Sequence, residues 1–152
     1  MTVDVKHRGC DRKYTFYVPE LLRPHVSVGK TVLCDTKHGY VSGIICDVHK
    51  QTFNNIKGHK NIVAVRSVVR LNRIVIPELF IAHPVKEEKV IKQMKSFNKN
   101  NRFNTRVEGK QLSNGRVLLT DGYSTYRAAQ RLNCQELLVW VKGRQLLLNF
   151  RK

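Results

Sequence analysis

The chain has 152 residues, enough for one ordinary domain or two small ones, which excludes a large multidomain enzyme. Lys and Arg number 28 against 11 Asp and Glu, so the net charge of +17 favours a polyanionic partner and disfavours a cationic one. Hydrophobic residues at 41% and aromatic residues at 8% suffice for a packed core, which excludes a disordered basic tail.

The sequence also indicates a cellular compartment. No apolar run approaches the roughly 20 residues that cross a bilayer, and the first ten residues are too polar for a signal peptide. We therefore expect a cytoplasmic protein without membrane association. In that compartment cysteines stay reduced, so we expect free thiols at Cys10, Cys34, Cys46 and Cys134.

Residues 1–69 are predicted to form a small β-rich module. The β-branched and aromatic run at 14–18 indicates a strand, and the runs at 28–35 and 40–48 flank a glycine turn, which predicts a hairpin. A further strand is expected at 61–69, and short strands at this spacing are typical of a small barrel. This half carries 11 basic and 5 acidic residues, a charge of +6.

Residues 70–152 are predicted to form an α+β domain in the order β-α-β-β-α-β-β, beyond a soft boundary near 69–72. The expected strands lie at 73–77, 106–112, 117–120, 137–141 and 145–150, with a tight turn at 113–115. Apolar residues at helical spacing from Val90 to Phe97 predict one amphipathic helix, which the polar stretch 98–104 ends. A second helix is expected from Gly122 to Leu132, with Asn133 in a left-handed conformation at its end. This half carries 17 basic and 6 acidic residues, a charge of +11.

The start of that second helix is a candidate phosphate site. A strand enters the helix through Asp121-Gly122, which leaves the first backbone N–H groups without helical acceptors and next to the positive end of the helix dipole. Hydroxyl groups and one guanidinium can add further donors. The candidate residues are Asp121, Gly122, Tyr123, Ser124, Thr125 and Arg127. In the alternative interpretation Asp121 only caps the helix and Arg127 is solvated.

The segment Asp121-Gly122, followed by Tyr126-Arg127-Ala128-Ala129, resembles the signature of the ParB/sulfiredoxin-like superfamily. The resemblance covers about residues 70–142 and implies the fold of that superfamily. It also implies a phosphate-binding turn, which holds CTP in ParB proteins and ATP or ADP in sulfiredoxins and related small-molecule kinases. Some ParB-like proteins are nucleases, and compact basic members are frequent in phages and mobile elements.

The sequence departs from that signature at two positions. Thr125 stands where the superfamily usually has an arginine, and Tyr123 stands where sulfiredoxins have their reactive cysteine, so reductase chemistry is not expected. A nucleotide, CTP or ATP with Mg²⁺, is the cofactor that the resemblance implies. For catalysis Glu78 is the best-placed carboxylate, but no paired carboxylates suggest a two-metal nuclease. An enzyme is therefore the weaker hypothesis.

Two short pairs suggest an alternative zinc site. His7 and Cys10 are separated by two residues, as are Cys46 and His49, and their convergence would give four ligands for a tetrahedral ion. Against this hypothesis, Cys46 lies in a strand-like run, where cysteine is a common core residue.

Basic and aromatic residues provide the last signal. The basic residues predicted to contact a phosphate backbone are Arg70, Arg73, Lys86, Lys89, Lys92, Lys95, Lys99, Arg102, Arg106 and Arg131. A solvated helix face is the alternative for the lysines. Aromatic residues of the first half either stack on single-stranded bases or fill the core, and these are Tyr14, Phe16, Tyr17, Tyr40 and Phe53.

Together these features predict a nucleic-acid-binding protein, with DNA favoured over RNA. A nucleotide-dependent phosphotransferase or hydrolase, or a ParB-like nuclease, is one alternative. A basic module that binds an acidic protein partner is another.

Overall fold

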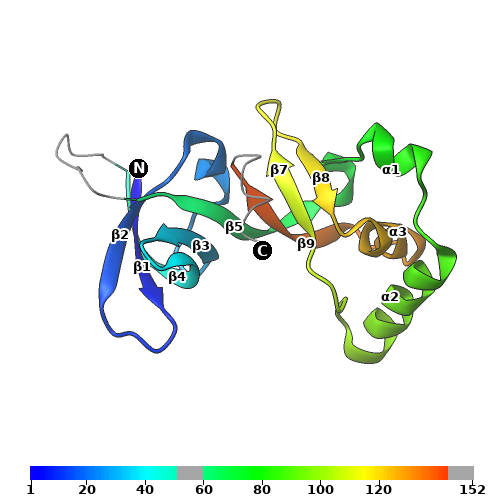
Figure 1. Ribbon diagram of the computed structural model, residues 1–152, viewed down its shortest axis with the longest axis horizontal. Coiled ribbons are helices and arrows are strands. Elements are labelled where there is room, and N and C mark those ends of the chain that lie inside the picture. Colours follow the sequence, from blue (N-terminus) through cyan, green and yellow to red (C-terminus); the bar gives the residue numbers. More distant parts are fainter. Residues whose placement is uncertain (51–59, 144–152) are drawn as a thin grey trace. The chain divides into compact units, whose positions relative to one another are not determined.

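The computed structural model describes residues 1–50 and 60–143, so the expected strand at 145–150 and Phe53 lie outside the described residues (Figure 1). The protein is of the α+β class, and the nine strands of the described part form a mixed sheet. The chain divides into two compact units. Unit 1 contains Met1–Arg66 together with Lys142, and unit 2 is Ser67–Val141.

Unit 1 is built from five strands, of which the last continues into unit 2. They are β1 (Thr2–His7), β2 (Lys13–Tyr17), β3 (Thr31–Thr36), β4 (Gly39–His49) and β5 (Ile62–Arg70), in the sheet order β2-β1-β4-β3-β5. A 3₁₀-helix at Glu20–His25 follows β2. The expected hairpin between β3 and β4 is present, with Thr36 opposite Gly39, whose φ of +98° suits only glycine in a tight turn. Strand β1 was not expected, although Val3 and Val5 alternate with polar residues as in a half-buried strand.

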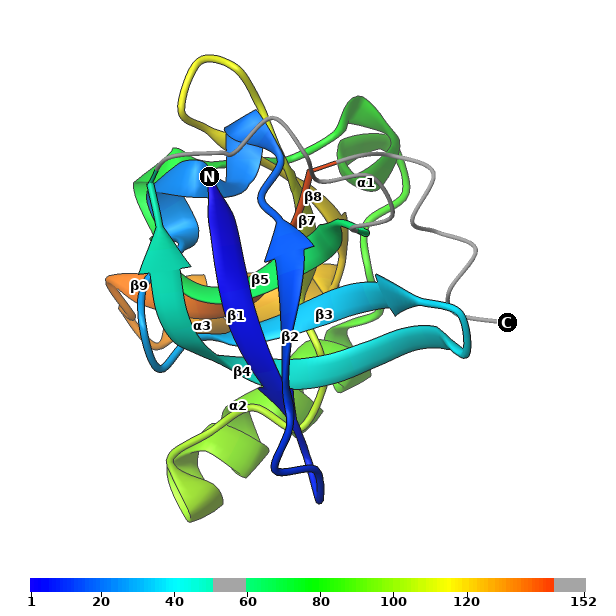
Figure 2. The same ribbon diagram turned by 90° about the vertical axis from the view of Figure 1, so that its left-hand side faces the viewer.

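The sheet of unit 1 curls because one long strand serves two neighbours. The first half of β4 pairs with β3 and its second half with β1, and Figure 2 shows its curved path. The register shifts between Asp4 and Val5, where Cys46 is the extra residue of a bulge. An isolated bridge joins Tyr17 to Asn61, next to the start of β5, and so brings the two edges of the sheet together. Val3, Val5, Val32 and Ile45 point into the buried interior.

Unit 2 contains three helices and four strands of its own among the residues described. After a 3₁₀ turn (Leu71–Arg73) come β6 (Ile74–Val75), α1 (Glu78–Ala82), α2 (Glu87–Asn100), β7 (Glu108–Gln111), β8 (Val117–Asp121), α3 (Tyr123–Arg131) and β9 (Glu136–Lys142). The strand order is β5-β9-β7-β8-β6, with β6 parallel to β8 and β7 antiparallel to β8. The short helix α1 was not expected, since Pro77 precedes it and His83 ends it within five residues.

The helices of unit 2 close its core on one side of the sheet. Figure 1 shows α2 and α3 next to each other beside β7 and β8. Val117 and Leu119 of β8 are buried, and α3 adds Ala128 and Ala129, both without exposed surface. Asn133 has φ +58°, the left-handed conformation predicted for the end of α3. No helix in the described ranges is long and apolar enough to cross a membrane.

Candidate nucleic-acid interface

Helix α2 separates its lysines from its buried side. Val90 and Gln93 are buried, with 1% and 3% of their surface exposed, whereas Lys89, Lys92, Lys95 and Lys99 are all exposed. At 100° per residue the four lysines fall within an arc of about 120° on the side opposite Val90. We call these four residues, together with the exposed Lys86 at the helix N-cap, the lysine face.

The lysine face has little neutralising charge. Within residues 1–50 and 60–143, none of its five ammonium groups forms an ion pair with a carboxylate. The one acidic residue in the same arc is Glu88, which lines a shallow hollow of about 320 Å³ with Ile91, Lys92 and Lys95. From Lys89 to Lys99 the face is about 15 Å long, at a rise of 1.5 Å per residue.

Two contacts fix α2 in unit 2 and so set the direction of the lysine face. The Gln93 side chain donates to Asn104 Oδ1 (2.6 Å) and accepts from the Asn104 backbone N–H (3.2 Å). Phe97 stacks on Phe103 with 4.8 Å between the ring centroids. These contacts hold the segment after α2, which carries Arg102 and Arg106, against the helix.

Arg131 has a structural partner. Its two terminal nitrogens donate to both carboxylate oxygens of Glu87, and the Nη2–Oε2 distance is 2.8 Å. These hydrogen bonds hold the pKa of Glu87 below its usual value. The bidentate pair connects the end of α3 to the start of α2. Arg131 therefore helps to position α2, and a phosphate here would compete with the Glu87 carboxylate for its guanidinium.

The remaining predicted arginines lie outside the helices. Arg70 and Arg73 are exposed at the end of β5 and in the following turn, and Arg102 is exposed after α2. The guanidinium of Arg106 lies over the Trp140 ring, 5.0 Å from its centroid. The sequence does not indicate this contact. Trp140 is half-buried, and its ring is a good partner for a guanidinium.

The start of α3 is less open to an anion than its sequence suggests. Gly122 is the N-cap with φ +93°, and its N–H donates to Asp121 Oδ1 (3.0 Å). The Asp121 carboxylate thus brings a negative charge to the corner where a phosphate would bind. The hydroxyl of Thr125 is buried and lies 2.5 Å from that of Thr105, so it faces the interior and not a ligand.

Arg127 is also occupied by its own helix. Its Nε donates to the Tyr123 hydroxyl (2.8 Å), one terminal nitrogen donates to Gln130 (2.9 Å), and its guanidinium lies over the Tyr123 ring. Tyr123 is itself buried under Phe80 of α1, with 5.3 Å between the centroids. Gly122, Ser124 and Arg127 are partly exposed, but the Gly122 N–H and the Arg127 guanidinium are already engaged in hydrogen bonds.

The structure gives the catalytic candidate no partners. Glu78 is exposed as the first residue of α1. Within the described ranges, no three His, Cys, Asp or Glu side chains come close enough to hold a metal ion.

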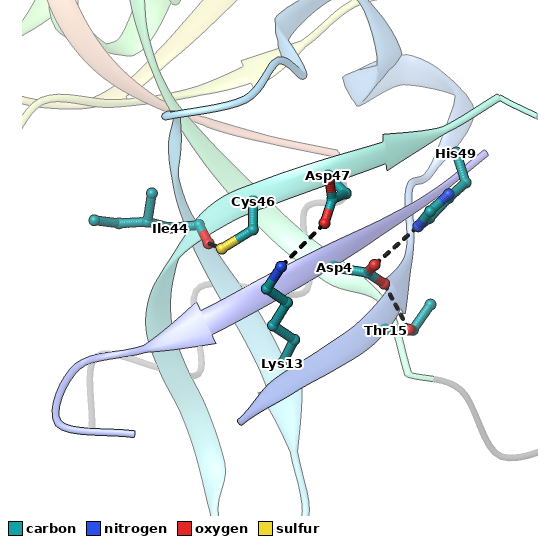
Figure 3. A network of polar contacts seen from close by, with 7 residues as sticks. All are labelled: Asp4, Lys13, Thr15, Ile44, Cys46, Asp47 and His49. Atoms are coloured by element: carbon teal, nitrogen blue, oxygen red, sulfur yellow. Dashed lines mark hydrogen bonds and ion pairs between the residues drawn. The ribbon is translucent and has the colours of Figure 1, made fainter. Parts of the chain in front are cut away.

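The proposed zinc ligands do not converge, and the strand register explains why. His49 lies opposite Thr2, whereas His7 lies opposite Gly43, five residues further along β1, which is about 17 Å at the rise of a strand. His49 instead bonds Asp4 (2.9 Å), as Figure 3 shows, and His7 Nδ1 contacts the Ser42 carbonyl (3.0 Å). The thiol of Cys46 donates to the Ile44 carbonyl (3.7 Å) and that of Cys10 to the Arg12 carbonyl (3.8 Å). The four candidate ligands are therefore not brought together among the described residues.

Comparison with known proteins gives a likeness of structure. No protein-family model and no curated protein matches the chain. The crystal structure of sulfiredoxin from Arabidopsis thaliana matches over 57% of this chain and 97% of that chain, with 17% sequence identity and a TM-score of 0.47. This likeness is one of structure over about half of the chain, and it carries no statement about activity.

Proposed function

We propose that this protein binds nucleic acid, with DNA as the first candidate, through the lysine face of α2. The observation that carries the proposal is the row of five exposed lysines without carboxylate partners in the described structure. In a protein with a net charge of +17, unpaired lysines on one rigid helix form a localised positive field.

The spacing of these lysines suits a phosphate backbone. Lys92, Lys95 and Lys99 follow each other at three and four residues, so their side chains leave the helix on one side. A length of about 15 Å equals the axial rise of four to five nucleotides of one strand, at about 3.4 Å each. Binding of this kind gains its free energy from counterion release and reads no base sequence.

The nucleotide-dependent enzyme is not favoured by any single observation. Thr125 and Arg127 are engaged inside unit 2, and Asp121 places a carboxylate at the helix start. The acidic-protein alternative shares its electrostatics with the proposal. Both predict binding that weakens with salt, so the choice of probe must separate them.

The test is a salt titration of binding by fluorescence anisotropy, with a labelled 20-base-pair DNA duplex and with the variant K92Q/K95Q/K99Q. Each lysine that contacts a phosphate contributes about 0.9 to the slope of log K against log salt, so the triple variant should reduce the slope by about 2.7. Glutamine keeps helix propensity near that of lysine, so α2 should stay folded.

A matched control removes the same charge from other elements. Arg23, Lys50 and Arg116 are exposed and lie outside α2, and R23Q/K50Q/R116Q should leave the slope within about one unit of the wild type. Equal losses in the two triple variants would show that binding depends on net charge alone. No binding of wild-type protein at 50 mM salt would refute the proposal.

A further inference from the structure

A groove in unit 1 lies on elements that the proposed DNA contact does not use. Its volume is about 760 Å³. It is lined by the end of β1, the first residues of β2 and the β3–β4 turn, and Lys60 lines it as well. The strand register contributes to this groove, because β1 pairs with β2 on one side and with β4 on the other, so His7 lies near both Lys13 and Gly43.

The lining of the groove is mainly basic. Four cations line it, Arg12, Lys13, Lys37 and Lys60, against a single carboxylate, Asp35. Only Lys13 among the four has a carboxylate partner in the described structure, since its ammonium lies 3.3 Å from Asp47 (Figure 3). A ligand in this groove therefore meets an excess of positive charge.

The groove also has an accessible aromatic surface. Tyr14 is 41% exposed, whereas Phe16 is buried and belongs to the core. The guanidinium of Arg12 lies over the Tyr14 ring, 5.3 Å from its centroid, and the His7 ring lies 5.8 Å away. A planar cation on an exposed tyrosine is a surface on which flat, electron-rich rings stack.

We propose that this groove binds single-stranded nucleic acid, with a base stacked on the Tyr14–Arg12 pair and phosphates beside Lys37 and Lys60. The inference rests on the proposed function, which it deepens by adding a second, base-contacting site. Single strands are required because the bases of a duplex are stacked on each other and do not offer their faces. The carboxylates of an acidic peptide would pair with the lysines, but acidic side chains offer no ring to stack on the exposed tyrosine.

The test compares Tyr14→Leu with Tyr14→Phe in binding to a fluorescent dT12 strand and to a blunt-ended 12-base-pair DNA duplex. Loss of the aromatic ring should weaken dT12 binding about 5- to 150-fold, as alanine substitution at stacking sites does, while Tyr14→Phe should retain it. Neither variant should alter binding to the duplex. Because Tyr14 is 41% exposed and lies outside the buried core, both variants should have melting temperatures close to that of the wild type.

A second variant keeps the test valid if Tyr14→Leu fails to fold. Lys37 and Lys60 are both exposed, and K37Q/K60Q should reduce the salt slope for dT12 by about 1.4. Unchanged dT12 binding in folded Tyr14→Leu or in K37Q/K60Q would overturn the proposal. Displacement of dT12 by polyglutamate of equal charge, as effectively as by unlabelled dT12, would overturn it in favour of an acidic protein.

The two proposals fail in different ways. If K92Q/K95Q/K99Q keeps the duplex salt slope while Tyr14→Leu loses dT12, the groove is supported and the lysine face is not. If the triple variant loses duplex binding while Tyr14→Leu still binds dT12, the lysine face is supported and the groove is not.

Discussion

Replacing Gly122 by alanine tests how closely the entrance to α3 is packed. Gly122 has φ +93°, and a Cβ built on it would lie 3.0 Å from both Cα and Cγ2 of Val107. One of these neighbours is a backbone atom of the segment that leads into β7, so side-chain rotation cannot relieve the contact.

Two costs add in this variant. An L-residue in the left-handed region loses about 1–2 kcal/mol relative to glycine. Insertion of a methyl group against a fixed backbone costs a further 1–3 kcal/mol, as small-to-large changes in packed sites typically do. We therefore expect Gly122→Ala to lower the free energy of unfolding by about 2–5 kcal/mol.

The assay is urea unfolding followed by the fluorescence of Trp140, the only tryptophan, which lies in unit 2 with Gly122. Gly115 supplies the matched control, because its φ is +86° but a Cβ there meets no atom within 4 Å. Gly115→Ala should lower the free energy of unfolding only by the cost of the left-handed conformation, about 1–2 kcal/mol. Equal destabilisation by the two variants would show that Val107 does not restrict Gly122, and the reasoning from packing would be refuted.

Three further outcomes follow from particular side chains. Burial alone would raise the pKa of Asp4, but hydrogen bonds from His49 and Thr15 bring it below the ordinary value of 3.8. The ionised Asp4 therefore stabilises the folded state fully above that pH, and this stabilisation is lost as the pH falls through the lowered pKa. Asp4→Asn should be less stable than wild type by about 1 kcal/mol at pH 7 in urea unfolding, and the two curves should meet below the folded-state pKa. Burial raises the pKa of Cys34 to about 12, so a thiol reagent at pH 8 should label it only after unfolding, as mass spectrometry of modified peptides would show; labelling at the rate of Cys10 would contradict its burial. Gln93→Ala removes both hydrogen bonds to Asn104 and should cost about 2–3 kcal/mol in thermal unfolding, whereas a change within error would mean that these two hydrogen bonds do not help to hold α2.

Local patterns predicted those elements whose periodicity or turn chemistry is strong. The helical spacing of Val90 and Phe97 placed α2 and its exposed lysines, and the turns at Gly39 and Gly115 placed two hairpins. The helix after Gly122 and the left-handed Asn133 were predicted from the same kind of signal. Strand β1 was missed although its apolar and charged residues alternate as in a half-buried strand, and α1 was missed because five residues are too few to show a helical period.

Contacts between distant segments escaped prediction. Spacing alone allowed His7 and His49 to meet at one metal, but antiparallel pairing with β1 places them at its opposite ends. Likewise, the sequence predicts Arg131 as a free cation, but the packing of α3 beside α2 places it next to Glu87. The Tyr123–Arg127 contact is an exception, since two residues four apart on a helix are neighbours and the sequence contained that signal.

The sequence by itself determined the excess of positive charge, the lysine face of α2 and the helix that begins at Gly122, because each depends on composition or on neighbours within one or two turns. The tertiary structure alone decided which donors at that helix start stay available and which residues line the groove around Tyr14. Those outcomes depend on strand register and on helix packing, which join residues separated by tens of positions in the chain, and no local pattern encodes such pairings.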